Sequence, residues 1–135
     1  MKTIMSNVAQ PKPLLVSDLM EASVESFDEA TTLDLLADLF RDLGSIGTTI
    51  TDHGRVVGIV APIDLPTERD SQRLLQASDV MEPVEEHVRK SWPVERADTL
   101  MEKSPLSVAV PVFADESEAV VGVLARASSR RSKPS

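Results

Sequence analysis

The sequence contains no cysteine and no tyrosine, and its 135 residues include only one tryptophan, three phenylalanines and two histidines. The absence of cysteine excludes disulfides and thiolate chemistry. The scarcity of aromatic rings leaves few platforms on which bases could stack, which argues against a protein that binds single-stranded nucleic acid. Aliphatic side chains must therefore fill most of the core.

Long hydrophobic runs are also missing. No apolar stretch approaches the roughly 18 residues that a membrane helix needs. The first residues, Met1–Asn7, lack the continuous apolar segment of a secretory signal. We therefore expect a cytoplasmic protein with no membrane contact.

Positive charge is scarce in the body of the chain. The charged residues after position 125 are all basic: Arg126, Arg130, Arg131 and Lys133. Because the whole chain has a net charge of −8, residues 1–125 carry −12. A body this acidic repels nucleic acid and anionic membranes. We expect the serine-rich basic end to be a disordered tail rather than a binding site.

The residues of common catalytic and metal sites are largely absent. His53 and His87 lie in different halves of the chain, and neither has a second ligand-type residue at a metal-binding spacing. There is no evident nucleophile–base pair, glycine-rich phosphate loop or zinc signature. We expect neither an enzyme nor a metal site.

What the chain does contain is an internal repeat. The pattern Ser-Asp-aliphatic-Met-Glu occurs at residues 17–21 and again at 78–82, 61 residues later. An apolar strand with a central glycine occurs around Gly58 and again around Gly122, 64 residues later. Two markers at nearly the same spacing indicate a duplicated unit.

Each copy is predicted to run strand, helix, strand, strand, helix. In the first copy we expect strands at 23–27, 46–51 and 56–60 and helices at 35–43 and 67–76, the second helix also opening with a capping box. In the second copy we expect strands at 87–92, 108–112 and 119–125, a helix at 94–103 and a stunted last helix. Pro111 indicates that its strand is an edge or ends there, and the turn at 52–55 is typical of a hairpin.

The first helix has the clearest signals. Thr31 is the expected N-cap, with Asp34 reaching back to complete a capping box. Apolar residues at helical spacing form one continuous stripe: Leu35, Leu36, Leu39, Phe40 and Leu43. Gly44 is expected to end the helix in a left-handed conformation.

These elements predict an α+β fold. A three-stranded sheet with helices on one face does not close a core alone, so we expect two β-α-β-β-α repeats packed sheet to sheet with pseudo-two-fold symmetry. The predicted division is a flexible lead-in at 1–13, the first repeat at 14–76, the second at 77–130 and the basic tail at 131–135.

The ordered set of motifs, present twice, resembles the CBS domain (the cystathionine-β-synthase repeat). The chain looks like a tandem pair, or Bateman module, over roughly residues 14–130. The resemblance implies a regulatory module that binds AMP, ADP, ATP or S-adenosylmethionine in clefts between the repeats. It also implies a homodimer that acts on a separate partner protein, with no cofactor required.

The family's ligand signature is Gly-aliphatic-aliphatic-Thr/Ser-x-x-Asp, in which the Asp accepts ribose hydroxyls and the Thr/Ser contacts phosphate. In the first copy Gly58 and Asp64 match, while Ala61 stands at the hydroxyl position. By the resemblance, Asp64 is the candidate ribose acceptor. As a residue, it is equally suited to capping the turn that follows the strand.

In the second copy only Gly122 matches, because Ala125 and Ser128 replace the hydroxyl and the acid. Candidate phosphate ligands by sequence position are four arginines: Arg55, Arg69, Arg73 and Arg126. Each is also compatible with a solvated surface position. Two functions therefore stay open at this point: a sensor of adenosine ligands, and a ligand-free dimeric scaffold for protein interaction with degenerate nucleotide sites.

Overall fold

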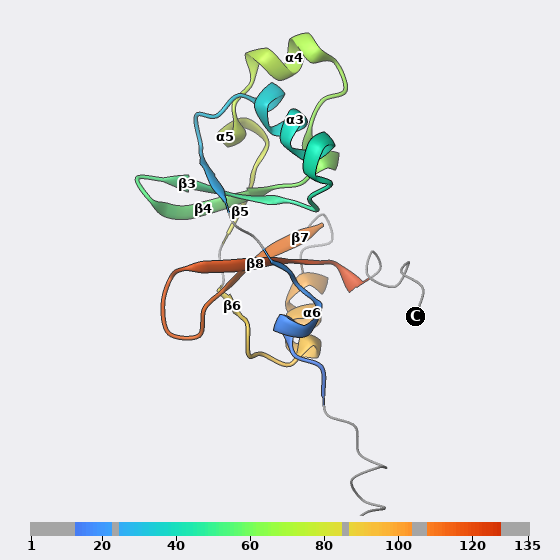
Figure 1. The fold of residues 1–135 in the computed structure, drawn as a ribbon, viewed down its shortest axis with the longest axis vertical. Coiled ribbons are helices and arrows are strands. Elements are labelled where there is room, and N and C mark those ends of the chain that lie inside the picture. The colour runs from blue at the N-terminus through green and yellow to red at the C-terminus, as the bar shows by residue number, and fades with distance from the viewer. Residues whose placement is uncertain (1–12, 23–24, 85–86, 104–107, 128–135) are drawn as a thin grey trace, which may run out of the picture.

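The computed structural model describes residues 13–22, 25–84, 87–103 and 108–127. Two four-stranded mixed sheets face each other, and the helices cover their outer faces (Figure 1). One sheet has the strand order β2-β3-β4-β5 and the other the order β1-β8-β7-β6. The predicted α+β class, with sheet packed against sheet, is confirmed.

The half that we call the upper half carries the first of these sheets. Its elements are β2 (Ser26–Asp28), α3 (Leu33–Leu43), β3 (Thr48–Asp52), β4 (Arg55–Val60), the 3₁₀ turn η1 (Pro62–Asp64), α4 (Arg69–Leu74), α5 (Ala77–Val80) and β5 (Glu82–Pro83). The lower half contains α2 (Val16–Leu19), β1 (Glu21–Ala22), β6 (Val88–Arg89), α6 (Val94–Glu102), β7 (Ala109–Phe113) and β8 (Val120–Ala125).

The two sheets each have four strands, rather than three, because a short strand crosses to the other copy. β1, from the first copy, pairs with β8 through Glu21 and Ala22. β5, which opens the second copy, pairs with β4 of the first. The expectation of three-stranded sheets was therefore wrong, since a two-residue strand carries no periodic signal in the sequence.

The two sequence markers meet in space across this exchange. Met81 packs on Gly58, where an added Cβ would lie 2.6 Å from its Sδ, and Met20 packs on Gly122 with the same separation. Each glycine is thus the place where the methionine marker of the other copy approaches the backbone. This contact explains why both markers recur at nearly the same interval.

The marker itself is one helical turn capped by its own acid. The Leu15 amide donates to Asp18 Oδ2 at 2.9 Å, and the Gln76 amide donates to Asp79 Oδ2 at 2.8 Å. The expected single helix over 67–76 is therefore two short helices, because Leu75 is extended and Gln76 starts a new capped turn. α4 follows Glu68 with no side-chain cap, so the capping box predicted for it is not formed.

The start of α3 differs from the prediction by one residue. Thr32, not Thr31, is the N-cap, and no side-chain cap bond forms there. The Leu33 amide donates instead to the Leu75 carbonyl at 3.0 Å. A hydrogen bond with the Thr32 side chain, and then bonds with backbone amides, hold the pKa of Asp34 below its usual value. Gly44, at φ 65°, ends the helix as predicted.

The predicted apolar stripe of α3 divides between core and surface. Leu33, Leu36 and Phe40 are buried in the upper core. Leu35 and Leu43 are instead 58% and 64% exposed. The apolar arc of the helix is wider than the sheet beneath it can cover, so part of the stripe faces outward.

Smaller differences concern the strands. The turn into β4 has positive φ at His53 and Gly54, as a tight hairpin requires. β7 lies between β8 and β6, so Pro111 does not mark an edge strand. β6 pairs only with Val112 and Phe113, which places Pro111 just outside that pairing. The predicted last helix of the second copy falls largely outside the described residues.

Three apolar clusters hold the layers together. The upper core is centred on Leu33, Leu36 and Ile50, and the lower core on Val88, Val112 and Leu124. A third cluster joins Ile59 of β4 to Ala109 and Val123 of the facing sheet, with Ile46 packed beside them. This third cluster is small, so the seam between the halves is held mainly by the exchanged strands and a few apolar contacts.

Candidate ligand site at the seam between the halves

Asp64 caps the turn that follows β4. Its Oδ2 accepts a hydrogen bond from the Ala61 amide at 2.8 Å, and its own amide donates to the Ala61 carbonyl at 2.9 Å. The same acid-to-amide bond occurs at Asp18 and Asp79, three residues after the amide in each case. The capping interpretation of Asp64 therefore has a direct contact, although a carboxylate with one bond can still accept others.

Ala61 and Gly58 are both buried and lie along the inner part of this strand. Ala61 is 4% exposed. Its methyl group supplies no donor for a phosphate, so the hydroxyl of the family signature has no replacement at this position. Gly58 admits Met81, which gives that glycine a packing role independent of any ligand.

The arginines predicted to meet a phosphate are separated from Asp64 or already engaged. Arg55 begins β4 and Asp64 follows its end, and six residues of strand span about 20 Å. Arg126 donates from Nη1 to the Met101 carbonyl at 3.2 Å. Arg73 pairs with Asp70 at 3.2 Å. Ser128 lies outside the described residues.

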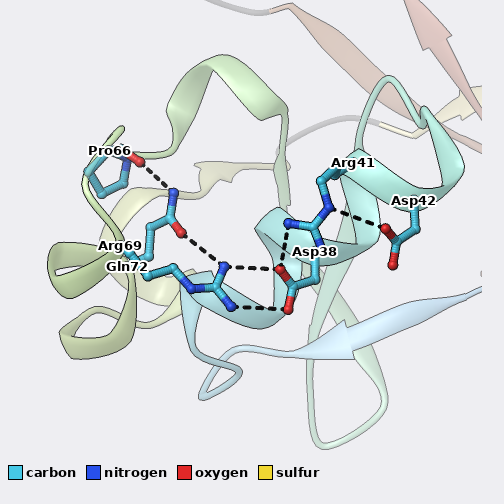
Figure 2. Close-up of polar contacts among 6 residues, drawn as sticks. All are labelled: Asp38, Arg41, Asp42, Pro66, Arg69 and Gln72. Atoms are coloured by element: carbon cyan, nitrogen blue, oxygen red, sulfur yellow. Dashed lines mark hydrogen bonds and ion pairs between the residues drawn. The ribbon is translucent and has the colours of Figure 1, made fainter.

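Arg69 joins α4 to α3 (Figure 2). Its two terminal nitrogens bond Asp38 Oδ1 at 2.9 Å and Oδ2 at 3.2 Å, in the two-pronged geometry that guanidinium groups form with carboxylates. The hydrogen bond from Arg69 holds the pKa of Asp38 below its usual value and raises that of the guanidinium. This arginine therefore has a structural role between two helices.

A hollow opens at the seam between the halves, where β1 of the lower sheet meets the upper half. It measures about 370 Å³, including the part open to solvent. Its walls come from β1, β2, α3 and the stretch before β3: Glu21, Ala22, Glu25, Phe27, Leu39, Leu43, Ser45, Gly47 and Thr48. A molecule in this hollow would contact both halves at once.

Two hydrogen bonds shape the polar wall of this hollow. The Ile46 amide donates to Glu21 Oε1 at 3.1 Å, which ties β1 to the loop before β3. The buried hydroxyl of Thr48 donates to the Glu25 backbone carbonyl at 3.3 Å. Phe27, Leu39 and Leu43 provide the apolar wall.

None of the residues predicted from the sequence lines this hollow. Val60 pairs with Thr48, so the end of β4 that leads to Asp64 lies beside a strand that contributes to the hollow. Sequence reasoning missed Glu21 and Glu25 because the hollow exists only once β1 has crossed to the lower sheet. The acid at the end of each Ser-Asp-aliphatic-Met-Glu marker was the one available signal.

Metal binding and membrane insertion find no support in the part of the chain that the structure describes. No group of three or more acidic, histidine or cysteine side chains there could hold a metal ion. No helix among the same residues has the length and apolarity needed to cross a membrane.

Comparison with known proteins gives matches at the level of structure. No protein-family model and no curated protein matches the chain. The CBS domain pair of protein MJ0100, solved with 5′-methylthioadenosine and S-adenosyl-L-methionine, superposes with a TM-score of 0.70 at 23% identity, over 90% of this chain and 94% of that chain. The chain folds as a CBS domain pair.

Other CBS pairs are similar to the same degree. The CBS domains of a transcriptional regulator from Streptococcus pneumoniae match with a TM-score of 0.64 at 24% identity, over 89% of this chain and 98% of that one. CBSX2 in complex with AMP matches with a TM-score of 0.63 at 23% identity, over 87% and 94%. At these identities the likeness concerns the fold of the CBS pair, and the predicted site residues stay predictions.

Proposed function

We propose that this CBS pair is a regulatory module that binds an adenosine-bearing ligand at the seam between its halves and acts on a separate protein without catalysing a reaction. Two similar CBS pairs were solved with AMP or with S-adenosyl-L-methionine and 5′-methylthioadenosine. The observation that carries the proposal is the seam hollow, whose walls come from both halves.

A ligand at this place has a physical means of regulation. The seam is held by the exchanged strands and one small apolar cluster around Ile59. A ligand that touches β1 and α3 together favours the arrangement in which both are in reach, and it shifts the population toward that arrangement. A partner protein that recognises the relative position of the two halves would then respond to the ligand.

The first test is ligand-dependent thermal stability. We expect at least one of AMP, ADP, ATP and S-adenosylmethionine to raise the melting temperature by several degrees, because a ligand at a hundred times its Kd stabilises the folded state by about 2.7 kcal/mol. With Asp64 as the ribose acceptor, Asp64→Ala should remove most of this rise. Thermal shift and calorimetry on wild type and variant measure both effects.

Asp79→Ala is the matched control for the capping role of Asp64. Both aspartates accept an amide at 2.8 Å, so each substitution should cost a similar amount of stability, about 1 kcal/mol. Only Asp64→Ala should weaken ligand binding. If no ligand raises the melting temperature at millimolar concentration, the sensor proposal is lost.

The exposed leucines of the outer helical layer favour a second function, a dimeric interaction scaffold. Leu35 and Leu43 of α3 are 58% and 64% exposed, and Leu74 of α4 is 82% exposed. Large apolar side chains gathered on one face are typical of a protein interface. A homodimer through this face would serve either function, since both the sensor and the scaffold are expected to pair.

Light scattering at micromolar concentration tests the pairing. We expect the wild type to be a dimer and the double variant Leu35→Asp, Leu43→Asp to be a monomer, because two new charges would have to be desolvated in the interface. Leu14→Asp is the control, since Leu14 is 52% exposed but belongs to the lower half. A monomeric wild type would contradict the scaffold.

A further inference from the structure

The charge on the walls of the seam hollow narrows the ligand class. Two of its residues, Glu21 and Glu25, carry carboxylates, and none of its lining residues is Lys, Arg or His. A phosphate entering the hollow would approach like charges with no cation to offset them. A cationic group would instead approach charges of opposite sign.

The nearest cation along α3 is already neutralised. Arg41 lies between the two leucines of the apolar wall, Leu39 and Leu43. Its guanidinium bonds Asp38 Oδ1 at 3.1 Å and Asp42 Oδ1 at 3.3 Å, as Figure 2 shows. With one guanidinium shared by two carboxylates, this part of the helix does not present net positive charge to the hollow.

The two glutamates of the hollow have different freedom. Glu21 is tied to the Ile46 amide, so its carboxylate helps to hold the seam. The only bond that Glu25 makes to the hollow wall in the hydrogen bonds above uses its backbone carbonyl, which accepts from Thr48. The Glu25 side chain is therefore the charge that can be altered without changing that bond.

We propose that the seam hollow selects an adenosine compound whose substituent is cationic or uncharged, such as a sulfonium or thioether, over one that carries phosphate. The inference rests on the proposed function and names the ligand class of the same site. The hollow, at about 370 Å³, falls in the range of small-molecule sites. Its apolar wall suits a base or a thioether, and its acidic wall suits a positive charge.

The test compares three ligands that share the nucleoside and differ in charge: AMP, 5′-methylthioadenosine and S-adenosylmethionine. Calorimetry on the full chain should give Kd values for the two sulfur compounds about tenfold or more below that for AMP. The gap should shrink at high salt, because exposed charges are screened. A lower Kd for AMP than for both others would overturn this inference and leave the proposed function standing.

Charge reversal at Glu25 supplies the matched variants. Glu25→Lys should lower the Kd for AMP by about tenfold and raise that for S-adenosylmethionine, with 5′-methylthioadenosine little changed. Glu116→Lys makes the same change of charge at an exposed position in the turn after β7 and should leave the order of the ligands as in wild type. An equal effect of both variants would mean that the net charge of the protein, and not the hollow, sets the preference. Binding of none of the three ligands would overturn the proposed function itself.

Discussion

Phe113→Ala should lower the free energy of unfolding by about 3–5 kcal/mol, the cost of removing a large ring from a filled core. Phe113 is the largest of the fully buried side chains among the described residues. It ends β7, and its ring centroid lies 4.3 Å from that of His87. The surrounding backbone belongs to two paired strands and cannot close readily over the cavity.

The same ring supports the turn that joins β7 to β8. The Arg89 guanidinium lies 5.9 Å from the centre of the Phe113 ring and donates to the carbonyls of Ala114 and Ser117 at 2.8 and 2.6 Å. Loss of the ring would leave this guanidinium less constrained. The local hydrogen bonds of the turn should therefore weaken together with the core.

Urea unfolding monitored by circular dichroism measures the effect, with the slope of the transition compared between variants. Phe27→Ala is the control, because Phe27 is only partly buried beside the upper core and should cost less. A loss below that of Phe27→Ala would show that the region around Phe113 is more loosely packed than the structure has it.

Gly122→Ala is expected to destabilise the protein by about 1–3 kcal/mol, as overpacking does, and more than Gly58→Ala. A Cβ on Gly122 would lie 2.7 Å from the backbone oxygen of Glu21. On Gly58 the corresponding backbone oxygen, that of Glu82, would be 3.0 Å away. Both positions also meet a methionine Sδ at 2.6 Å, but that is the end of a flexible side chain.

A double-mutant comparison separates the two sources of crowding. Met81→Ala in the Gly58→Ala background should recover part of the loss, because the side-chain clash is removed. Met20→Ala in the Gly122→Ala background should recover less, because the clash with the Glu21 carbonyl remains. Equal stability of Gly122→Ala and wild type would rule out the close approach of β1 to β8.

The sequence predicted the parts of the fold that local signals determine. The two-fold architecture followed from the recurring markers, and the left-handed end at Gly44 and the hairpin turn at His53–Gly54 followed from residue chemistry. The exchange of β1 and β5 could not be predicted, because two residues carry no periodicity and their partners lie about a hundred residues away in one case. The outward position of Leu35 required knowledge of how far the sheet extends.

For the site, sequence reasoning identified where to look but not what is there. The position of Asp64 was evident by resemblance, and its capping bond could have been inferred from Asp18 and Asp79, which stand at the same spacing from a capped amide. The hollow was not predictable, since Glu21 and Glu25 become its walls only through tertiary packing. Whether Asp64 or the hollow binds the ligand is decided by the variants described above.

The exchange of β1 and β5 also bears on how such a protein could begin as one copy. A single repeat would lack the fourth strand of its sheet and could obtain it only from the marker of a second molecule. Joining two copies in one chain turns that encounter between molecules into an intramolecular one, at an effective concentration in the millimolar range for a short connection. Gene duplication would thus have made permanent an assembly that a lone repeat could form only by association.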